Sequence, residues 1–241
     1  MPESAPHVRL KGIHKSFGHS TALDQVTCSV QPGEVVALFG RNGAGKTTLL
    51  KILALLMRPT AGEYQLRGEP ARRQPDRTRA QIGFISHSTY LYADLTALEN
   101  LKFFGALYDL SNLGDRIRGA LEDVKLWDRR HERVRGFSRG MQQRLSLART
   151  FLHDPSLLLL DEPYTGLDPI ASDLLDRLIE RHQKEGRTVI LTTHNLDLRL
   201  RVVSHVLVLE KGNVVFDEQG SGFTPQQFAG IFRAHVDEAE E

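Results

Sequence analysis

Short apolar runs alternate along the chain with longer segments in which apolar residues recur at helical spacing. Residues 157–160 are four consecutive leucines, the composition expected of a strand that is covered on both faces. Short β-rich runs at 34–39, 82–86, 188–193 and 206–209 predict further strands. Because helical segments separate these runs, the sequence predicts an α/β fold with a mostly parallel sheet.

A purely helical pattern interrupts this alternation over residues 90–155. Thr96 and Glu99 have the spacing of a capping box, which opens a helix, and Pro155 stops a later helix over 139–154. Apolar side chains recur at helical spacing here: Leu98, Leu101, Phe104 and Tyr108, followed by Ile117, Leu121 and Val124. We therefore expect a helical subdomain inserted into the α/β core.

Composition and charge narrow the class of protein. With 241 residues, 40% of them hydrophobic, the chain suits one large domain with a subdomain. The formal net charge of +1 gives no global field toward an anionic membrane or nucleic acid, so we expect no nucleic-acid partner. The single cysteine, Cys28, is expected to be a buried residue of a cytosolic protein.

The hydropathy of the chain and its first residues give no sign of a membrane-spanning segment or a secretory signal. No run of about 18 apolar residues occurs, and the first residues lack the features of a secretory signal, so we expect any function at a membrane to need a separate membrane partner. We divide the chain into a main domain over 7–217 and an extension over 218–241. Its last residues, 237–241, form an acidic tail.

A glycine-rich loop between a predicted strand and a predicted helix over 46–57 carries the strongest chemical signal. Its residues match the phosphate-binding loop pattern in the context that the pattern requires. We expect Lys46 to reach the β- and γ-phosphates, and the Thr47 hydroxyl to ligate Mg²⁺. The expected nucleotide-binding residues are Gly40, Arg41, Asn42, Gly43, Ala44, Gly45, Lys46, Thr47 and Thr48. The alternative is a glycine-rich turn without a ligand.

Acidic and imidazole side chains follow the ends of two predicted strands. Asp161 stands where a P-loop enzyme needs a carboxylate for Mg²⁺, and Glu162 is expected to act as general base toward water. His194 ends another apolar strand, at the edge where open α/β sheets place ligand-contacting groups, so we expect it near the γ-phosphate. The alternatives are a pair of solvated acids and an inert surface histidine.

The stretch Phe137-Ser138-Arg139-Gly140-Met141-Gln142-Gln143-Arg144 resembles the signature segment of the ABC ATPase family, usually Leu-Ser-Gly-Gly-Gln. The resemblance covers residues 8–216. It implies a P-loop NTPase fold with an antiparallel N-terminal β part, ATP and Mg²⁺ as ligands, and a homodimer of ATPase subunits. It also implies that Ser138, Gly140 and Met141 contact the ATP held by the opposite subunit, although Arg139 and Met141 depart from the commonest residues.

The same resemblance assigns roles to two further residues. Phe17 resembles the aromatic residue that stacks on adenine, and its alternative role is that of a core aromatic. Asp168 resembles the end of the loop that communicates across the dimer. Since Pro169 follows it, Asp168 also fits an ordinary helix N-cap, and the two roles are compatible. The implied catalytic residues are Lys46, Glu162 and His194.

Most members of the family carry a glutamine near the Mg²⁺ shell, and here that position is His87. A neutral imidazole accepts a hydrogen bond from metal-bound water as an amide oxygen does, but it also titrates near neutrality. The implied metal-site residues are thus Thr47, Asp161 and His87. The surrounding segment 82–101 resembles one subgroup, the haem-exporter ATPases of cytochrome c maturation.

These patterns predict the ATP-hydrolysing subunit of an ABC transporter on the cytoplasmic face of a bacterial-type membrane. We expect ATP to close a homodimer that drives a separate integral-membrane permease, in a haem-exporter complex of cytochrome c biogenesis. The alternatives are an ABC-2-type exporter of drugs or polysaccharide, a soluble ABC ATPase of repair or translation, and a nucleotide binder without hydrolysis.

Overall fold

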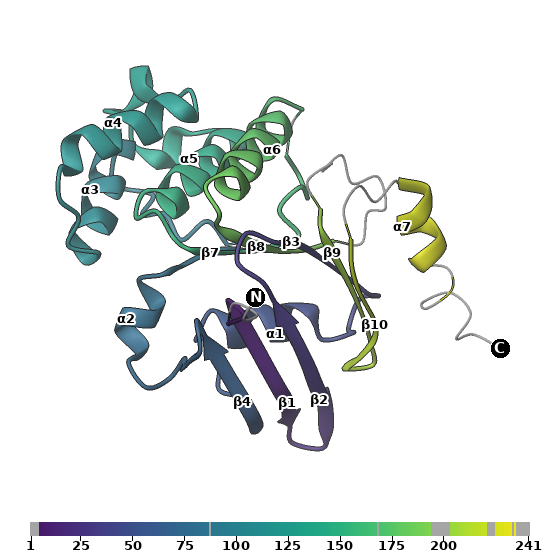
Figure 1. The fold of residues 1–241 in the computed structure, drawn as a ribbon. Helices are drawn as coiled ribbons and strands as arrows, with labels where there is room; N and C mark the ends of the chain where they lie inside the picture. Colours follow the sequence, from purple (N-terminus) through teal and green to yellow (C-terminus); the bar gives the residue numbers. More distant parts are fainter. Residues whose placement is uncertain are drawn as a thin grey trace.

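The computed structural model describes residues 5–86, 88–167, 169–193, 203–220, 225–232 and 234. Two β-sheets organise the fold (Figure 1). A layer of helices lies above the larger sheet, and helix α1 with the smaller sheet lies below it (Figure 1). The α/β architecture predicted from the sequence, with an antiparallel N-terminal part and a helical subdomain, is confirmed.

The larger sheet has the strand order β10–β9–β3–β8–β7–β6. All pairings in it are parallel except that of β9 with β10. Every residue of β3, β7 and β8 is buried, as the run of leucines predicts for strands covered on both faces. The strands are β3 (Val35–Phe39), β6 (Ile82–Ile85), β7 (Leu157–Asp161), β8 (Thr188–Thr192), β9 (His205–Glu210) and β10 (Asn213–Gln219).

The smaller sheet is antiparallel and has the order β2–β1–β4–β5. Its inward side chains and those of α1 (Lys46–Leu53) form one core with the lower face of the larger sheet. Cys28 belongs to this core, and its predicted burial is confirmed. The strands are β1 (Val8–Phe17), β2 (Ser20–Val30), β4 (Ala61–Leu66) and β5 (Glu69–Pro70), and a short helix, α2 (Pro75–Arg79), follows them.

A second core lies between the upper face of the larger sheet and the helical layer. The predicted capping box is present: the Thr96 hydroxyl accepts from the Glu99 amide, and the Glu99 carboxylate accepts from the Thr96 amide. The helices are α3 (Ala97–Leu107), α4 (Leu113–Asp123), α5 (Arg139–Phe151) and α6 (Pro169–Lys184), with short 3₁₀ turns at Trp127–Arg129 and Val134–Gly136. A last helix, α7 (Pro225–Phe232), lies in the C-terminal extension.

One helix is shorter than the sequence pattern predicts. The helix after the phosphate loop ends at Leu53, because Leu55 takes a left-handed conformation (φ 57°) and the amides of Leu56 and Met57 both donate to the Lys51 carbonyl.

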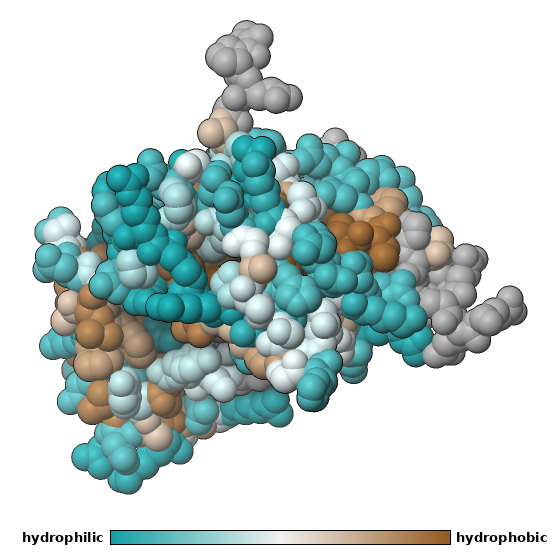
Figure 2. Space-filling view, turned by 90° about the horizontal axis from the view of Figure 1, so that it is seen from below, coloured by the Kyte–Doolittle hydropathy of each residue, from teal (hydrophilic) through white to brown (hydrophobic). Residues whose placement is uncertain are grey.

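Among the described residues, no helix is long and apolar enough to cross a membrane. The acidic tail 237–241 lies outside the described residues. Viewed from below, most of the surface is hydrophilic, with hydrophobic patches toward its edges (Figure 2).

A buried histidine, His205, connects strands at one edge of the larger sheet. His205 on β9 is fully buried, with Nδ1 3.1 Å from Glu34 Oε2 and Nε2 2.7 Å from Asp217 Oδ1 on β10. Burial acts to lower the pKa of His205, but the hydrogen bonds to the two carboxylates outweigh it, so the pKa is raised. When doubly protonated, the imidazole donates to both acids and joins β9, β10 and the segment before β3.

We predict that His205→Gln destabilises the protein more at about pH 6 than at about pH 9. A group whose pKa is raised on folding stabilises fully below its unfolded value of about 6.5, and this contribution is lost as the pH rises through the folded pKa. Loss of the charged hydrogen bonds should cost about 1–3 kcal/mol at the lower pH. Urea denaturation measures the difference, with exposed His19→Gln as control. An equal cost at both pH values would contradict a charged His205.

Candidate functional site

The phosphate loop follows β3 at the carboxyl edge of the larger sheet. Gly40 (φ 150°) and Gly45 (φ 105°) are held against neighbouring backbone, since an added Cβ would lie 2.3 Å from the Leu209 carbonyl oxygen and 2.4 Å from the Ala22 carbonyl oxygen, respectively. A Cβ at Gly43 would meet nothing within 4 Å. The loop is thus fixed at its two ends and open in the middle, as a cradle for a phosphate chain requires.

Lys46 begins α1 and points back into the loop. Its Nζ atom is buried with the side chain and donates to the carbonyl oxygens of Gly40 (2.7 Å) and Arg41 (3.0 Å). Burial lowers the pKa of Lys46, while Glu162 and Asp161 act to raise it. An anionic ligand in the loop would offer this ammonium group charged acceptors in place of neutral carbonyls. Beside Lys46, Arg41, Asn42, Gly43 and Thr47 are exposed, Ala44 is buried, and Thr48 is half-buried.

One carboxylate oxygen connects the loop to two strands. Asp161 at the end of β7 is buried, and its Oδ1 atom accepts from the Thr47 hydroxyl at 3.1 Å and from the Thr192 hydroxyl at 2.8 Å. A hydroxyl and a carboxylate side by side are the hard oxygen donors that Mg²⁺ prefers. The residues present therefore fit the predicted metal, and the structure brings together the predicted pair Thr47 and Asp161.

Glu162 takes a left-handed conformation (φ 49°), which separates its side chain from that of Asp161. Its amide donates to the Thr192 hydroxyl at 2.9 Å, and its Oε2 atom accepts from Thr165 at 3.4 Å. Thr192 thus orients both acids, a role that the sequence analysis missed. The only signal for it was a hydroxyl residue at the end of the neighbouring strand.

Glu162 faces a polar cavity of about 550 Å³, which Asp161 also lines. The cavity lies between the ends of β6 and β7 and the first turns of α5, which contribute Arg139, Gln142 and Gln143. A carboxylate facing a polar cavity with room for water is placed to accept a proton from it. The two glutamines were not expected to share a cavity with Glu162.

The signature segment opens α5 in the helical layer. Ser138 is the N-cap: its Oγ atom accepts from the Met141 amide at 3.3 Å, and its side chain is exposed. Gly140 is half-buried, and the Met141 side chain is buried in the upper core. The position of Met141 therefore gives no support to a side-chain contact with nucleotide, whereas the exposed helix N-terminus at Ser138 suits an anion.

The remaining predicted site residues lie at the ends of elements. Phe17 ends β1 with half of its side chain exposed, and Lys15 Nζ lies 4.9 Å from the ring centre. Its exposure rules out the alternative of a core aromatic and leaves the ring available for stacking. His87, Asp168 and His194 lie outside the described residues, so their roles stay predictions.

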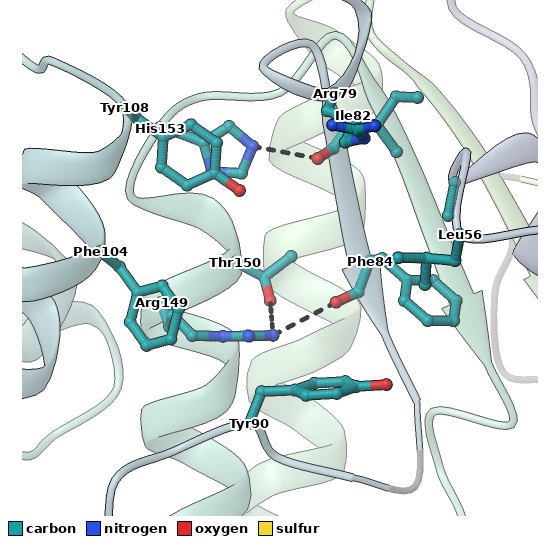
Figure 3. A pocket seen from close by; sticks show the side chains of 11 residues that line it. Leu56, Arg79, Ile82, Phe84, Tyr90, Phe104, Tyr108, Arg149, Thr150 and His153 are labelled. Atoms are coloured by element: carbon teal, nitrogen blue, oxygen red, sulfur yellow. Dashed lines mark hydrogen bonds between the residues drawn. The ribbon is translucent and has the colours of Figure 1, made fainter. Parts of the chain in front are cut away.

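A groove separates the core from the helical subdomain (Figure 3). Its cavity measures about 230 Å³. One wall carries Leu56, Ile82 and Phe84, and the other carries Tyr90, Phe104 and Tyr108 (Figure 3). At the base of the groove, the ring of His153 stacks on Tyr108 at 4.0 Å, and its Nε2 atom lies 3.2 Å from the Ile82 carbonyl oxygen.

Arg149 crosses the groove between aromatic side chains. Its guanidinium lies 5.1 Å from the ring centre of Phe104 and 5.5 Å from that of Tyr90, and it donates to the Phe84 carbonyl oxygen at 3.3 Å. Burial lowers the pKa of this guanidinium, and Tyr108 and Tyr90 act against that shift. The groove is therefore aromatic, with a fixed cation inside it. Sequence analysis did not identify it, because its walls come from distant segments.

Known proteins share this arrangement. The profile of the family described as "ABC transporter" matches residues 23–165. The Nod factor export ATP-binding protein I of Cupriavidus metallidurans is 35% identical over 86% of this chain and 69% of its own length. The ABC transporter ATP-binding protein NatA of Bacillus subtilis is 35% identical over 81% of this chain and 80% of its own length.

Solved structures agree in fold. An ATP-binding subunit of an ABC transporter superposes with a TM-score of 0.82 at 31% identity, covering 88% of this chain and 89% of the other. A dimeric ATP-binding cassette in a post-hydrolysis state, bound to ADP and Pi, superposes with a TM-score of 0.79 at 28% identity, covering 90% and 100%. With its phosphate loop and paired acids in the family's arrangement, this chain belongs to the ABC transporter family and is one of its ATP-binding, ATP-hydrolysing subunits.

Proposed function

We propose that this chain hydrolyses ATP to drive export through a separate integral-membrane permease, from the cytoplasmic face of the membrane. The observation that carries the proposal is the convergence of Lys46, Thr47, Asp161 and Glu162 on one edge of the sheet. These groups supply what phosphoryl transfer to water needs: phosphate binding, a metal position and a base. The names of the relatives, which include Nod factor export, support export as the direction.

Each side chain has a defined part in the reaction. Lys46 exchanges its carbonyl partners for phosphate oxygens, and its charge stabilises the negative charge that gathers there in the transition state. Thr47 and Asp161 would hold Mg²⁺, which, when bound, neutralises charge on the phosphates. Glu162, oriented by Thr192, accepts the proton of the attacking water in the polar cavity.

Two copies of the chain would complete each site. The phosphate loop leads into α1 below the sheet, whereas Ser138 opens α5 in the layer above it (Figure 1). Head-to-tail pairing would set the exposed N-terminus of α5 from one copy against the ATP held by the other. ATP then adds contacts that exist only in the closed dimer, so binding closes it and hydrolysis reopens it. The dimeric cassette of similar fold supports this assembly.

The groove between core and helical subdomain suits a helix of the permease. Its walls combine aliphatic and aromatic side chains from both parts, so an occupant would respond to movement between them. Tyr90 lines both the groove and the polar cavity of Glu162. This shared wall provides a short path between the catalytic carboxylate and the permease.

Two classes of exporter are candidates for this chain. The relatives described above are named for Nod factor export and NatA, and they favour an exporter outside cytochrome c maturation. Haem export is the second candidate, favoured by His87 and the segment 82–101 around it. The identity of the permease separates the two classes.

We predict that Lys46→Ala abolishes measurable ATP binding. The variant removes the only ammonium group that the described structure places inside the loop, and loss of a charged contact to phosphate should weaken binding about 100-fold or more. Isothermal titration calorimetry with MgATP provides the measurement. Lys51→Ala, on the same helix, is the matched control and should bind as wild type does. Unchanged affinity of Lys46→Ala would refute the assignment of the loop.

We predict that Glu162→Gln binds ATP but hydrolyses it at least about 100-fold more slowly, because an amide cannot accept the proton of the water. The closed dimer should then accumulate and elute at twice the monomer mass in size-exclusion chromatography with ATP. Glu63→Gln, an exposed change on β4, controls for the lost charge. A Glu162→Gln protein that remains monomeric with saturating ATP would contradict the sandwich.

We predict that Tyr90→Ala lowers the amount of permease that co-purifies with this chain from detergent-solubilised membranes by about tenfold, since a buried aromatic contact contributes about 1–2 kcal/mol at an interface. Tyr92→Ala is the control, because Tyr92 is as exposed (50% against 51%) but does not line the groove. Quantitative mass spectrometry identifies the permease and thereby its cargo class. Equal recovery with both variants would remove the groove as the docking site.

A further inference from the structure

Positive charge is concentrated in one part of the chain. Residues 58–79 contain six arginines and three acids, although the whole chain carries a net charge of only +1. The remainder of the chain is therefore net negative. The segment includes β4, β5 and α2, and β4 and α2 lie on the same side of the molecule (Figure 1).

Three of these arginines lie near one another, and we refer to Arg58, Arg72 and Arg79 as the arginine rim. Arg79 lines the groove, and Arg72 donates to the backbone carbonyl of Met57. The pKa of Arg72 is lowered by burial and further by the charges of Arg58 and Arg79, so each of these two guanidinium groups lies close enough to repel that of Arg72.

The rim carries little compensating charge. Within the described chain, the ion pair recorded for the rim joins Arg79 Nη1 to Asp76 Oδ1 at 2.7 Å, and 94% of the Asp76 side chain is exposed. Such a pair contributes little in water. Like charges held together on a surface lower the stability of the free protein, so the arrangement favours an anionic surface that neutralises it.

An apolar side chain projects next to the rim. Leu56 is 58% exposed, in the turn that ends α1, and it precedes Arg58 by two residues. Exposed apolar tips flanked by arginines suit the boundary between lipid headgroups and acyl chains, because the tip enters the apolar region while each guanidinium pairs with phosphate.

We propose that the arginine rim binds the anionic lipid headgroups that surround the permease, while Leu56, at the edge of the groove, contacts the adjoining apolar region of the lipid. The inference rests on the proposed function, since a permease helix in the groove turns this face of the chain toward the membrane. An acidic segment of a protein is less favoured than lipid, because Arg58 and Arg79 are exposed and come from different segments of the chain, so they present a spread of positive charge rather than a site for a single carboxylate.

Vesicle co-sedimentation tests the proposal on the purified full chain without permease. Wild type should bind vesicles that contain roughly 40% phosphatidylglycerol, an anionic lipid. It should not bind vesicles of pure phosphatidylcholine, which carry no net charge. Arg58→Gln/Arg79→Gln should bind the anionic vesicles about tenfold or more weakly, since each arginine near such a surface contributes about fivefold. Arg72 is kept because it holds the Met57 carbonyl.

A matched control separates local recognition from overall charge. Arg118→Gln/Arg181→Gln also removes two charges, from exposed pairs with Glu122 and Asp123 on α4 and α6, and should bind as wild type does. Equal binding by the two double variants, or equal wild-type binding to both vesicle types, would overturn the proposal. Thermal melting confirms that all variants are folded.

Calorimetry with MgATP on the same preparations distinguishes this inference from the proposed function. Intact ATP binding together with failed vesicle binding would overturn the lipid site alone. Failed ATP binding by wild type would overturn the proposed function instead. A rim variant that loses the permease but sediments with vesicles as wild type does would assign the rim to an acidic protein surface and thus overturn the lipid proposal.

Discussion

The site depends on one buried carboxylate oxygen that accepts two hydroxyl groups. Asp161 Oδ1 takes hydrogen bonds from Thr47 after the phosphate loop and from Thr192 at the end of β8. A buried carboxylate is costly unless it is hydrogen-bonded, so these contacts fix α1, β7 and β8 relative to one another. The same oxygen fits a Mg²⁺ ligand, and the constraint that orders this edge of the sheet also places the metal.

The two covered faces of the larger sheet explain why the phosphate loop and the signature segment lie in different layers. Strands such as β7, buried throughout, need a cover above and below. The lower cover holds α1 and the phosphate loop, while the upper cover holds α5 and its exposed N-terminus. Because two separate cores form, the upper layer has a boundary with the rest of the chain, and the aromatic groove lies there.

The sequence analysis succeeded where the signal is local. The run of leucines predicts β7, the Thr96–Glu99 spacing predicts a cap, and the loop pattern predicts the cradle, because each depends on neighbours within a few residues. It missed Thr192 and the groove around Arg149, because these depend on which distant strands and helices become neighbours. The early end of α1 was not predicted, because the residue in the left-handed conformation there is Leu55 and not the glycine that usually marks such a helix end.

Net charge is another property for which the sum over the sequence says little about a local surface. A total of +1 predicts no overall attraction to an anionic membrane, and this was the expectation from the sequence. The charges are distributed unevenly: Arg58, Arg72 and Arg79 lie near an exposed leucine, and only the exposed Asp76 is recorded as an ion-pair partner of these arginines within the described residues. Electrostatic attraction in salt solution acts over about 8–10 Å, so a membrane responds to the local cluster and not to the sum. A nearly neutral protein can therefore present one face that binds anionic lipid.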